Sequence, residues 1–234
     1  MGKTWAIASG SGGVGKTTIA LALAVGAAHK GLKTILLDAS GISRSCDLLL
    51  GIESTMTVDL IDAISDQIDI GAALYPVAQC KELYLTNVSL HDHASLSDFS
   101  GIILALQSMC DVLVIDLPSG EVSLENNVLT MQDELIFVLR PDDASIRSTE
   151  RLMQQMRGCS AGTSLLLNRI RKERVKKGLQ YAHEAVSMML DCPLLGMLAE
   201  DEACVLDIGA GKAVQAVTRL GSPVKDMLAN LLQR

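Results

Sequence analysis

The sequence predicts an α/β fold, a doubly wound and mainly parallel β-sheet with helices on both faces. Two observations lead to this prediction. Short apolar runs of strand length alternate with stretches of helical length almost to the end of the chain. The composition is 49% hydrophobic but only 3% aromatic, as expected of a buried sheet built from aliphatic side chains. The 234 residues suit one domain, and we expect residues 1–234 to form it.

The predicted elements follow from these alternating patterns. Seven short apolar runs are predicted to be strands, at 4–8, 34–37, 83–85, 112–115, 135–139, 164–167 and 194–198. The segments with helical spacing or capping signals are 17–30, 57–64, 97–109, 123–131, 144–156, 175–190 and 224–232. The connections between the strands are expected to be right-handed. Because the strands are expected to be parallel, their carboxyl ends share one edge of the sheet, where a ligand is expected to bind.

A complete phosphate-binding motif, G-x-x-x-x-G-K-[ST], runs from Gly10 to Thr17 between the first strand and the first helix. Glycines let the backbone turn and direct several N–H groups at one point, and the helix N-terminus adds a positive dipole. Lys16 supplies charge for the β- and γ-phosphates, and the Thr17 hydroxyl is a Mg²⁺ ligand. The sequence therefore predicts nucleoside triphosphate binding by Gly10, Ser11, Gly12, Gly13, Val14, Gly15, Lys16, Thr17 and Thr18.

Two carboxylates at strand ends complete the predicted site. Asp116 ends the apolar run at 112–115, and Asp38 ends the run at 34–37. Both are expected to face the phosphates and, with Thr17, to hold Mg²⁺ directly or through water. A role for Asp116 as a helix cap or turn residue is the alternative. Pro118 and Gly120 predict a turn after Asp116 whose backbone N–H approaches the γ-phosphate.

Charge and cysteine spacing exclude several classes of protein. The net charge of −7 argues against a general affinity for nucleic acid or anionic membranes. The six cysteines contain no C-x-x-C pair, and no signal peptide is found, so reduced thiols in a cytoplasmic protein are expected. No apolar run reaches the roughly 18 residues of a membrane-spanning helix.

Three segments together resemble the MinD/ParA group of P-loop ATPases, and within it the MinD branch: SGSGGVGKTT (9–18), LLDASGISRSCDLLLG (36–51) and DVLVIDLPSG (111–120). The resemblance implies ATP or ADP with Mg²⁺, hydrolysis of ATP to ADP and phosphate, and an ATP-dependent homodimer. It also implies spatial placement of the division site, or of a flagellum or pilus, through a protein partner. The catalytic positions carried over are Lys16, Asp38, Ser40 and Asp116. Those carried over for the base are Asn168, Arg169, Leu198, Glu200 and Asp201; for Asn168, an ordinary polar residue at a strand end is the alternative.

Two positions depart from the pattern of that group. Ser11 stands where the group has a second lysine, which reaches the partner's phosphates across the dimer. Ser40 stands where the group has an aspartate that orients the attacking water, and serine is not a general base at neutral pH. We therefore expect weak or absent hydrolysis. Arg44 could supply the missing charge, although a solvated loop arginine is the alternative. A scaffold that binds nucleotide, does not hydrolyse it and only recruits protein partners is the second functional hypothesis.

The last predicted helix could either cover the core or insert into a membrane. Residues 224–232 carry an apolar stripe but few basic residues and no aromatic anchor, so we expect this helix to cover the core rather than insert into a membrane. Access to the inner membrane would then depend on a partner.

Metal or iron–sulfur cluster insertion, performed by other members of the superfamily, is disfavoured because Cys46 and Cys110 stand alone. DNA partition is disfavoured by the acidic charge.

Overall fold

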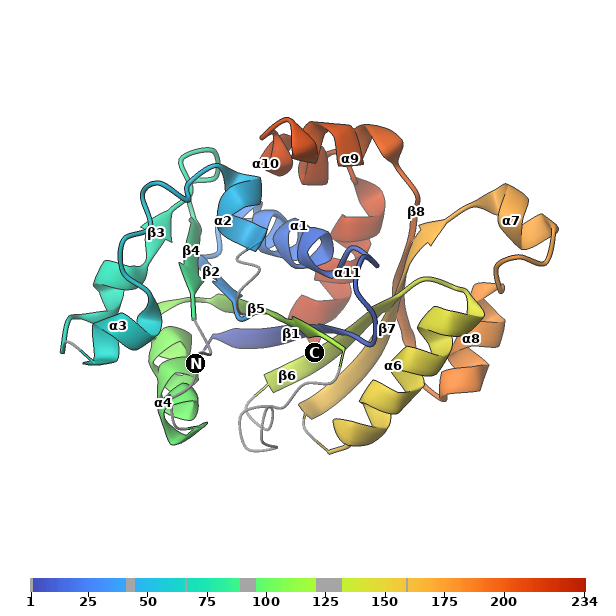
Figure 1. Ribbon diagram of the computed structural model, residues 1–234, viewed down its shortest axis with the longest axis horizontal. Helices are drawn as coiled ribbons and strands as arrows, with labels where there is room; N and C mark the ends of the chain where they lie inside the picture. The colour runs from blue at the N-terminus through green and yellow to red at the C-terminus, as the bar shows by residue number, and fades with distance from the viewer. Residues whose placement is uncertain (1, 41–44, 66, 89–95, 121–131, 159) are drawn as a thin grey trace.

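The computed structural model describes residues 2–40, 45–65, 67–88, 96–120, 132–158 and 160–234. Within them an eight-stranded sheet crosses the molecule in the order β3-β4-β2-β5-β1-β6-β7-β8 (Figure 1). Neighbouring strands pair in parallel, except that β3 is antiparallel to β4. The strands are β1 Lys3–Ser9, β2 Thr34–Asp38, β3 Tyr75–Pro76, β4 Leu83–Asn87, β5 Val112–Ser119, β6 Gln132–Leu139, β7 Ser160–Ile170 and β8 Leu194–Ala199.

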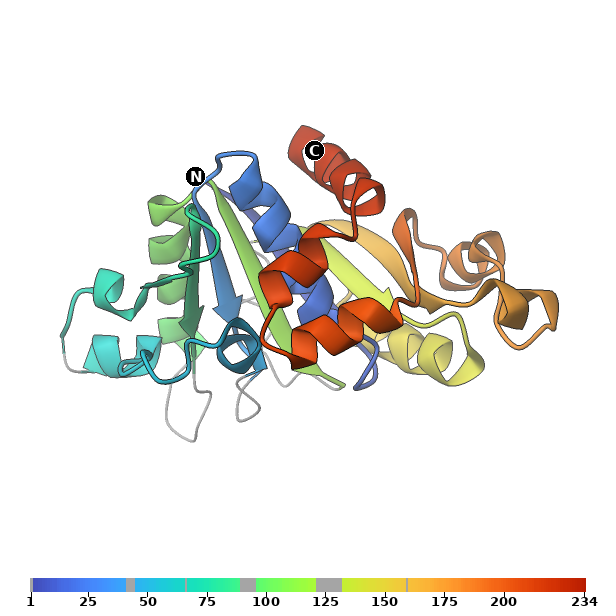
Figure 2. The ribbon, with the colours of Figure 1, turned by 90° about the horizontal axis from the view of Figure 1, so that it is seen from above.

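Helices cover both faces of this sheet (Figures 1 and 2). Buried side chains form one core with α1 Lys16–His29, α2 Ser45–Leu50, α10 Ala213–Thr218 and α11 Ser222–Gln233. A second core lies on the opposite face, with α3 Leu60–Ser65, the 3₁₀ helix η2 Ile70–Ala73, α4 Leu96–Met109, α6 Asp143–Gln155 and α8 His183–Leu190. The part of the chain that the structure describes also contains α7 Lys172–Lys176 and α9 Glu202–Gly209.

The alternation of side chains along a strand explains why both faces need cover. In β5, Val112 and Val114 belong to one core, whereas Leu113 and Ile115 belong to the other. All four side chains are buried. Because successive residues of a strand point to opposite faces, an uninterrupted apolar strand must be covered on both sides. The predicted doubly wound, mainly parallel α/β fold is therefore confirmed.

All seven predicted strands are present, as β1, β2, β4, β5, β6, β7 and β8. All seven are longer than predicted, and the difference is largest in β5, which continues through Pro118 to Ser119, and in β7, which runs from Ser160 to Ile170. The sequence analysis missed β3, which has only two residues and therefore shows no apolar alternation. The helix predicted at 123–131 lies outside the described residues.

The prediction of one helix over 175–190 is wrong. The structure has α7 and α8 with a turn between them, and Gly178 in that turn has a φ of +68°. This left-handed conformation is typical of the residue that follows a helix end, and the chain leaves the helical path there. The other predicted helices that fall within the described residues agree within a few residues, whereas α2, η2, α9 and α10 are short and were missed.

The last helix, α11, covers the core as predicted. Val224, Met227, Leu228 and Leu231 are buried, and all four belong to the core that α1 helps to form. Gly26 of α1 allows close contact, because a Cβ added there would lie 2.4 Å from Leu228 Cδ1. Among the described helices, none combines the length and the apolar character that crossing a membrane requires.

Candidate nucleotide-binding site

The predicted phosphate-binding loop joins the carboxyl end of β1 to the first turn of α1. Gly15 immediately precedes α1 and has a φ of +94°, which side-chain-bearing residues rarely adopt. A Cβ at Gly10 would lie 2.2 Å from the backbone carbon of Ser148 in α6, so only glycine fits there. Both glycines therefore hold the loop tightly between α6 and the start of α1, with the N-terminal N–H groups of α1 toward the loop.

Lys16 and Thr17 both contact Asp116, which lies beside Ile7 of β1 in the sheet. Lys16 Nζ is 2.5 Å from Asp116 Oδ1, and Thr17 Oγ1 donates to Asp116 Oδ2 at 2.7 Å. Lys16 is 5% exposed and Asp116 is completely buried. Burial raises the pKa of the Asp116 carboxyl above its ordinary value, and Lys16 and Thr17 act in the opposite direction. The ion pair therefore neutralises a carboxylate whose burial is otherwise unfavourable.

Asp38 lies directly beside Asp116, because the two are register partners of β2 and β5. Its Oδ1 accepts hydrogen bonds from Ser40 N at 2.9 Å and from Ser40 Oγ at 2.5 Å. Its Oδ2 accepts a hydrogen bond from Cys46 N at 2.9 Å. The two carboxylates that the sequence analysis placed at strand ends therefore meet at one edge of the sheet, close to Lys16 and Thr17.

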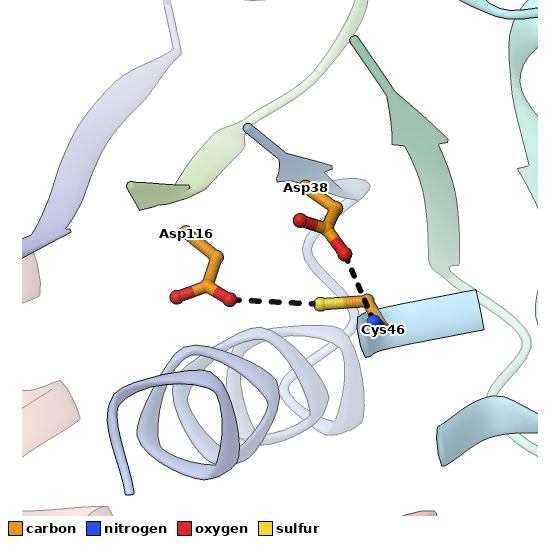
Figure 3. Close-up of side chains that lie close together, drawn as sticks. All are labelled: Asp38, Cys46 and Asp116. Atoms are coloured by element: carbon orange, nitrogen blue, oxygen red, sulfur yellow. Dashed lines mark hydrogen bonds between the residues drawn. The ribbon is translucent and has the colours of Figure 1, made fainter. Parts of the chain in front are cut away.

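Cys46 lies beside the two carboxylates, a position that the sequence analysis did not predict. It lies in the first turn of α2, and its sulfur points between Asp38 and Asp116 (Figure 3). Cys46 Sγ is 3.9 Å from Asp116 Oδ2. Burial and the two nearby carboxylates raise the pKa of this thiol well above its ordinary value. The sequence signal was its position shortly after Asp38, in the segment that follows the predicted strand at 34–37.

A hollow beside the first turn of α1 brings together the residues expected to contact the base. It lies against the ends of β7 and β8 and is lined, among others, by Thr18, Asn168, Arg169, Leu198, Glu200 and Asp201. Asn168 Nδ2 donates to the carbonyl of Val14 at 2.8 Å, so this side chain also fixes the phosphate-binding loop.

Arg169, Glu200 and Asp201 have structural contacts of their own. Arg169 has a φ of +56° and its carbonyl accepts a hydrogen bond from Gln180, whereas Glu200 forms an ion pair with Arg171. Asp201 caps α9 through Cys204 N.

Pro118 and Gly120 lie at the end of β5, next to β1. Pro118 is part of the strand rather than of a separate turn. The Gly120 N–H donates to the Ser9 carbonyl at 2.9 Å, so in this structure it is directed at β1. Arg44, the suggested replacement cation, lies outside the described residues.

The residues present fit a magnesium–triphosphate group. Thr17, Asp38 and Asp116 offer oxygen atoms, which are the ligands that Mg²⁺ prefers. The Ser11 hydroxyl in the loop is shielded from solvent and has no hydrogen-bond partner among the described residues. A buried hydroxyl without a partner is unfavourable, and a phosphate oxygen would satisfy it. The chemistry of the loop and the carboxylates therefore suits a phosphate group and a cation.

Comparison with known proteins agrees with this geometry. The family model of the CobQ/CobB/MinD/ParA nucleotide binding domain matches residues 5–214. The septum site-determining protein MinD of Synechocystis sp. is 28% identical over 227 residues, covering 95% of this chain and 85% of the relative.

Two solved structures share the fold. MinD in the MinC:MinD cell division protein complex of Aquifex aeolicus has a TM-score of 0.87 at 23% identity, covering 99% of this chain and 96% of the other. MinD from Pyrococcus horikoshii, complexed with Mg-ADP, has a TM-score of 0.81 at 21% identity, covering 100% and 96%. The chain thus belongs to the CobQ/CobB/MinD/ParA family of nucleotide-binding domains and, within it, resembles MinD.

Proposed function

We propose that this protein binds ATP and ADP with Mg²⁺ and acts as a nucleotide-dependent switch, with slow hydrolysis of ATP to ADP and phosphate. The ATP-bound form is a homodimer that recruits a protein partner. Its task is spatial placement in the cytoplasm, of the division site or of a flagellum or pilus, with any approach to the inner membrane made through the partner. The contact of Lys16 and Thr17 with the buried Asp116 is the observation that carries this proposal.

The residues at the sheet edge have separate tasks in this proposal. Lys16 leaves Asp116 and neutralises the β- and γ-phosphates, while the loop N–H groups hold the phosphate oxygens. Thr17, Asp38 and Asp116 hold Mg²⁺, which supplies neutralisation of the charge that develops on the phosphates. The hollow at Asn168 and Leu198 takes the base. Supporting this assignment, the related MinD of Pyrococcus horikoshii was solved with Mg-ADP.

Slow hydrolysis follows from Ser11 and Ser40. The Ser11 hydroxyl carries no charge and cannot reach a partner's phosphates as a lysine would. The Ser40 hydroxyl donates to Asp38 Oδ1, so it supports that carboxylate instead of accepting a proton from water. Both observations also favour a second candidate function, a scaffold that binds nucleotide, recruits partners and never hydrolyses ATP. Phosphate release separates the two functions.

Nucleotide binding itself is tested by replacing the loop lysine. We expect Lys16→Gln to weaken binding of ATP with Mg²⁺ by about 10- to 100-fold, because a hydrogen bond to a charged group contributes about 1.5–3 kcal/mol. Isothermal titration calorimetry measures the affinity. Lys225→Ala is the matched control, since Lys225 is an exposed lysine of α11 away from the loop. Equal affinity of the Lys16→Gln variant and the unaltered protein would overturn the proposal.

A further inference from the structure

Asp38, Cys46 and Asp116 form a buried cluster of three metal-ligating side chains from β2, α2 and β5 (Figure 3). One ligand atom from each residue lies within 4.8 Å of the other two. The exposed fractions are 3%, 1% and 0%. A magnesium site would not explain why a thiol lies beside the two carboxylates, because sulfur is a soft ligand and Mg²⁺ prefers oxygen. The cluster is therefore a mixed donor set within the nucleotide site.

The spacing of the donors fits a tetrahedral ion better than an octahedral one. A tetrahedral Zn²⁺ has bonds of about 2.3 Å to sulfur and about 2.1 Å to oxygen, which places those two ligands about 3.6 Å apart. Cys46 Sγ and Asp116 Oδ2 are 3.9 Å apart. Octahedral Mg²⁺, with bonds of about 2.1 Å, would place neighbouring ligands about 3.0 Å apart. Only a small closing movement is needed for a thiolate and a carboxylate to share a tetrahedral ion.

The charge of the cluster also favours a divalent cation. Within the part of the chain that the structure describes, Lys16 is the one cation that forms an ion pair with either carboxylate, and it contacts Oδ1 of Asp116. The other oxygen, Oδ2, faces the Cys46 sulfur. Asp38 is held by hydrogen bonds from Ser40 and Cys46 without a charged partner among these residues. Among the described residues, the two buried carboxylates therefore share a single cation, and a bound metal ion would supply further positive charge to this low-dielectric site.

We propose that the nucleotide-free protein binds one thiophilic divalent cation, Zn²⁺ or Cd²⁺, through Asp38, Cys46 and Asp116. The S–H bond of Cys46 breaks as the sulfur–metal bond forms, and the proton leaves to solvent. A water molecule fills the fourth position. Because the ion uses both carboxylates expected to hold Mg²⁺, it competes with magnesium nucleotide and keeps the switch empty. This competition rests on the proposed function, whereas the binding of the ion does not.

Cadmium alone is the probe that tests the site. Protein stripped with a chelator and kept reduced is titrated with Cd²⁺, and the ultraviolet sulfur-to-cadmium charge-transfer band and the heat of binding are recorded. We expect one equivalent of Cd²⁺ to bind with that band in the unaltered protein. Cys46→Ser should abolish the band and weaken this binding by more than about 100-fold, since loss of a residue that only hydrogen-bonds to a metal ligand already changes affinity by about 10- to 100-fold.

Cys80→Ser is the matched control. Cys80 is also buried, but it lies in the turn before β4, at the opposite end of the strands from the cluster. This variant should keep the band and the affinity. Cys46→Ala is the second variant if Cys46→Ser does not fold, as judged by its urea unfolding transition. An unchanged band in the Cys46 variants, or no band in the unaltered protein, would overturn the proposal.

Magnesium nucleotide separates this proposal from the proposed function. If both hold, ATP with Mg²⁺ displaces Cd²⁺ and removes the band, and the Cys46→Ser variant still binds ATP with Mg²⁺. Cadmium binding by a protein that does not bind ATP would refute the proposed function and leave the metal site standing. ATP binding without any Cys46-dependent cadmium binding would refute the metal site and leave the proposed function standing.

Discussion

Asp116 is more deeply buried than the two other charged side chains at this edge of the sheet, Lys16 and Asp38. It is completely buried, and burial raises the pKa of its carboxyl. Lys16 and Thr17 stabilise its charged form through two short contacts. In the nucleotide-bound form we expect Lys16 to move to the phosphates and a cation to take its place beside Asp116. The charge on Asp116 is then balanced in both forms, which is a requirement for a buried carboxylate in a switch.

Buried thiols give the protein a predictable response to alkaline pH. Burial raises the pKa of Cys192 from its ordinary value of 9.0 to about 11, so the folded protein holds this proton after the unfolded chain has lost it. Since the folded state binds more protons in that interval, the free energy of unfolding falls as the pH rises from 9 to about 11. Cys192→Ala should make this fall shallower, though not abolish it, because Cys110 also has a pKa of about 11.

Urea unfolding at several pH values between 8 and 11 measures the effect on stability. Ser187→Ala is a suitable control, because the Ser187 hydroxyl donates to the backbone carbonyl of Cys192 and leaves the thiol in place. That control should keep the full pH dependence. Identical slopes for Cys192→Ala and the unaltered protein would show that this thiol does not titrate as described.

Helix α11 is tied to strand β6 by an ion pair at the edge of the core. Arg234 Nη1 is 2.6 Å from Oε1 of Glu134, whose side chain is 3% exposed. Glu134 also accepts a hydrogen bond from Ser164 Oγ of β7, and Arg234 donates to the same hydroxyl at 3.0 Å. The three residues connect two strands to the helix that follows Gly221. Removing the cation would leave a buried carboxylate without its charged partner.

We expect Arg234→Ala to lower the free energy of unfolding by about 2 kcal/mol, because a buried charged group loses its partner but Arg234 itself is half exposed. Arg219→Ala is the control, since Arg219 and Asp207 form a more exposed ion pair and its loss should cost less than about 1 kcal/mol. The double variant Arg234→Ala/Glu134→Gln should recover part of the stability. Equal losses from Arg234→Ala and Arg219→Ala in urea unfolding would contradict this role.

The helices and strands that could be predicted are those with a clear local sequence pattern, whereas those that depend on tertiary contacts could not. Each of the seven longer strands contains a short apolar run, and α1 begins at a glycine-rich loop, so pattern alone identifies them. The break at Gly178 was missed because apolar and basic residues on either side continue a helical pattern. The meeting of Asp38 and Asp116 could be predicted, since parallel strands end at one edge. The place of Cys46 could not, because the six-residue α2 depends on tertiary contacts.

At the scale of the whole molecule, the sheet is packed on both faces, and the residues of the candidate site lie together at the edge where its parallel strands end. Both cores hold the strands in register, so Lys16, Asp38 and Asp116 from three different elements reach the same point. In the proposed function, this frame binds a triphosphate without the groups that accelerate its hydrolysis. Against the pattern of the MinD/ParA group, Ser11 and Ser40 replace a lysine and an aspartate, while Lys16, Thr17, Asp38 and Asp116 are present.

Steady-state release of phosphate from ATP with Mg²⁺ tests this account most directly, with the unaltered protein compared to the Ser11→Lys/Ser40→Asp double variant. We expect slow or undetectable release from the unaltered protein and an increase of at least about 100-fold in the double variant, since a charge reaching the γ-phosphate from a partner contributes roughly 10³–10⁵ in rate in related chemistry. The Lys16→Gln variant sets the background. Rapid release by the unaltered protein, unchanged by the double substitution, would contradict the account and direct attention to Arg44.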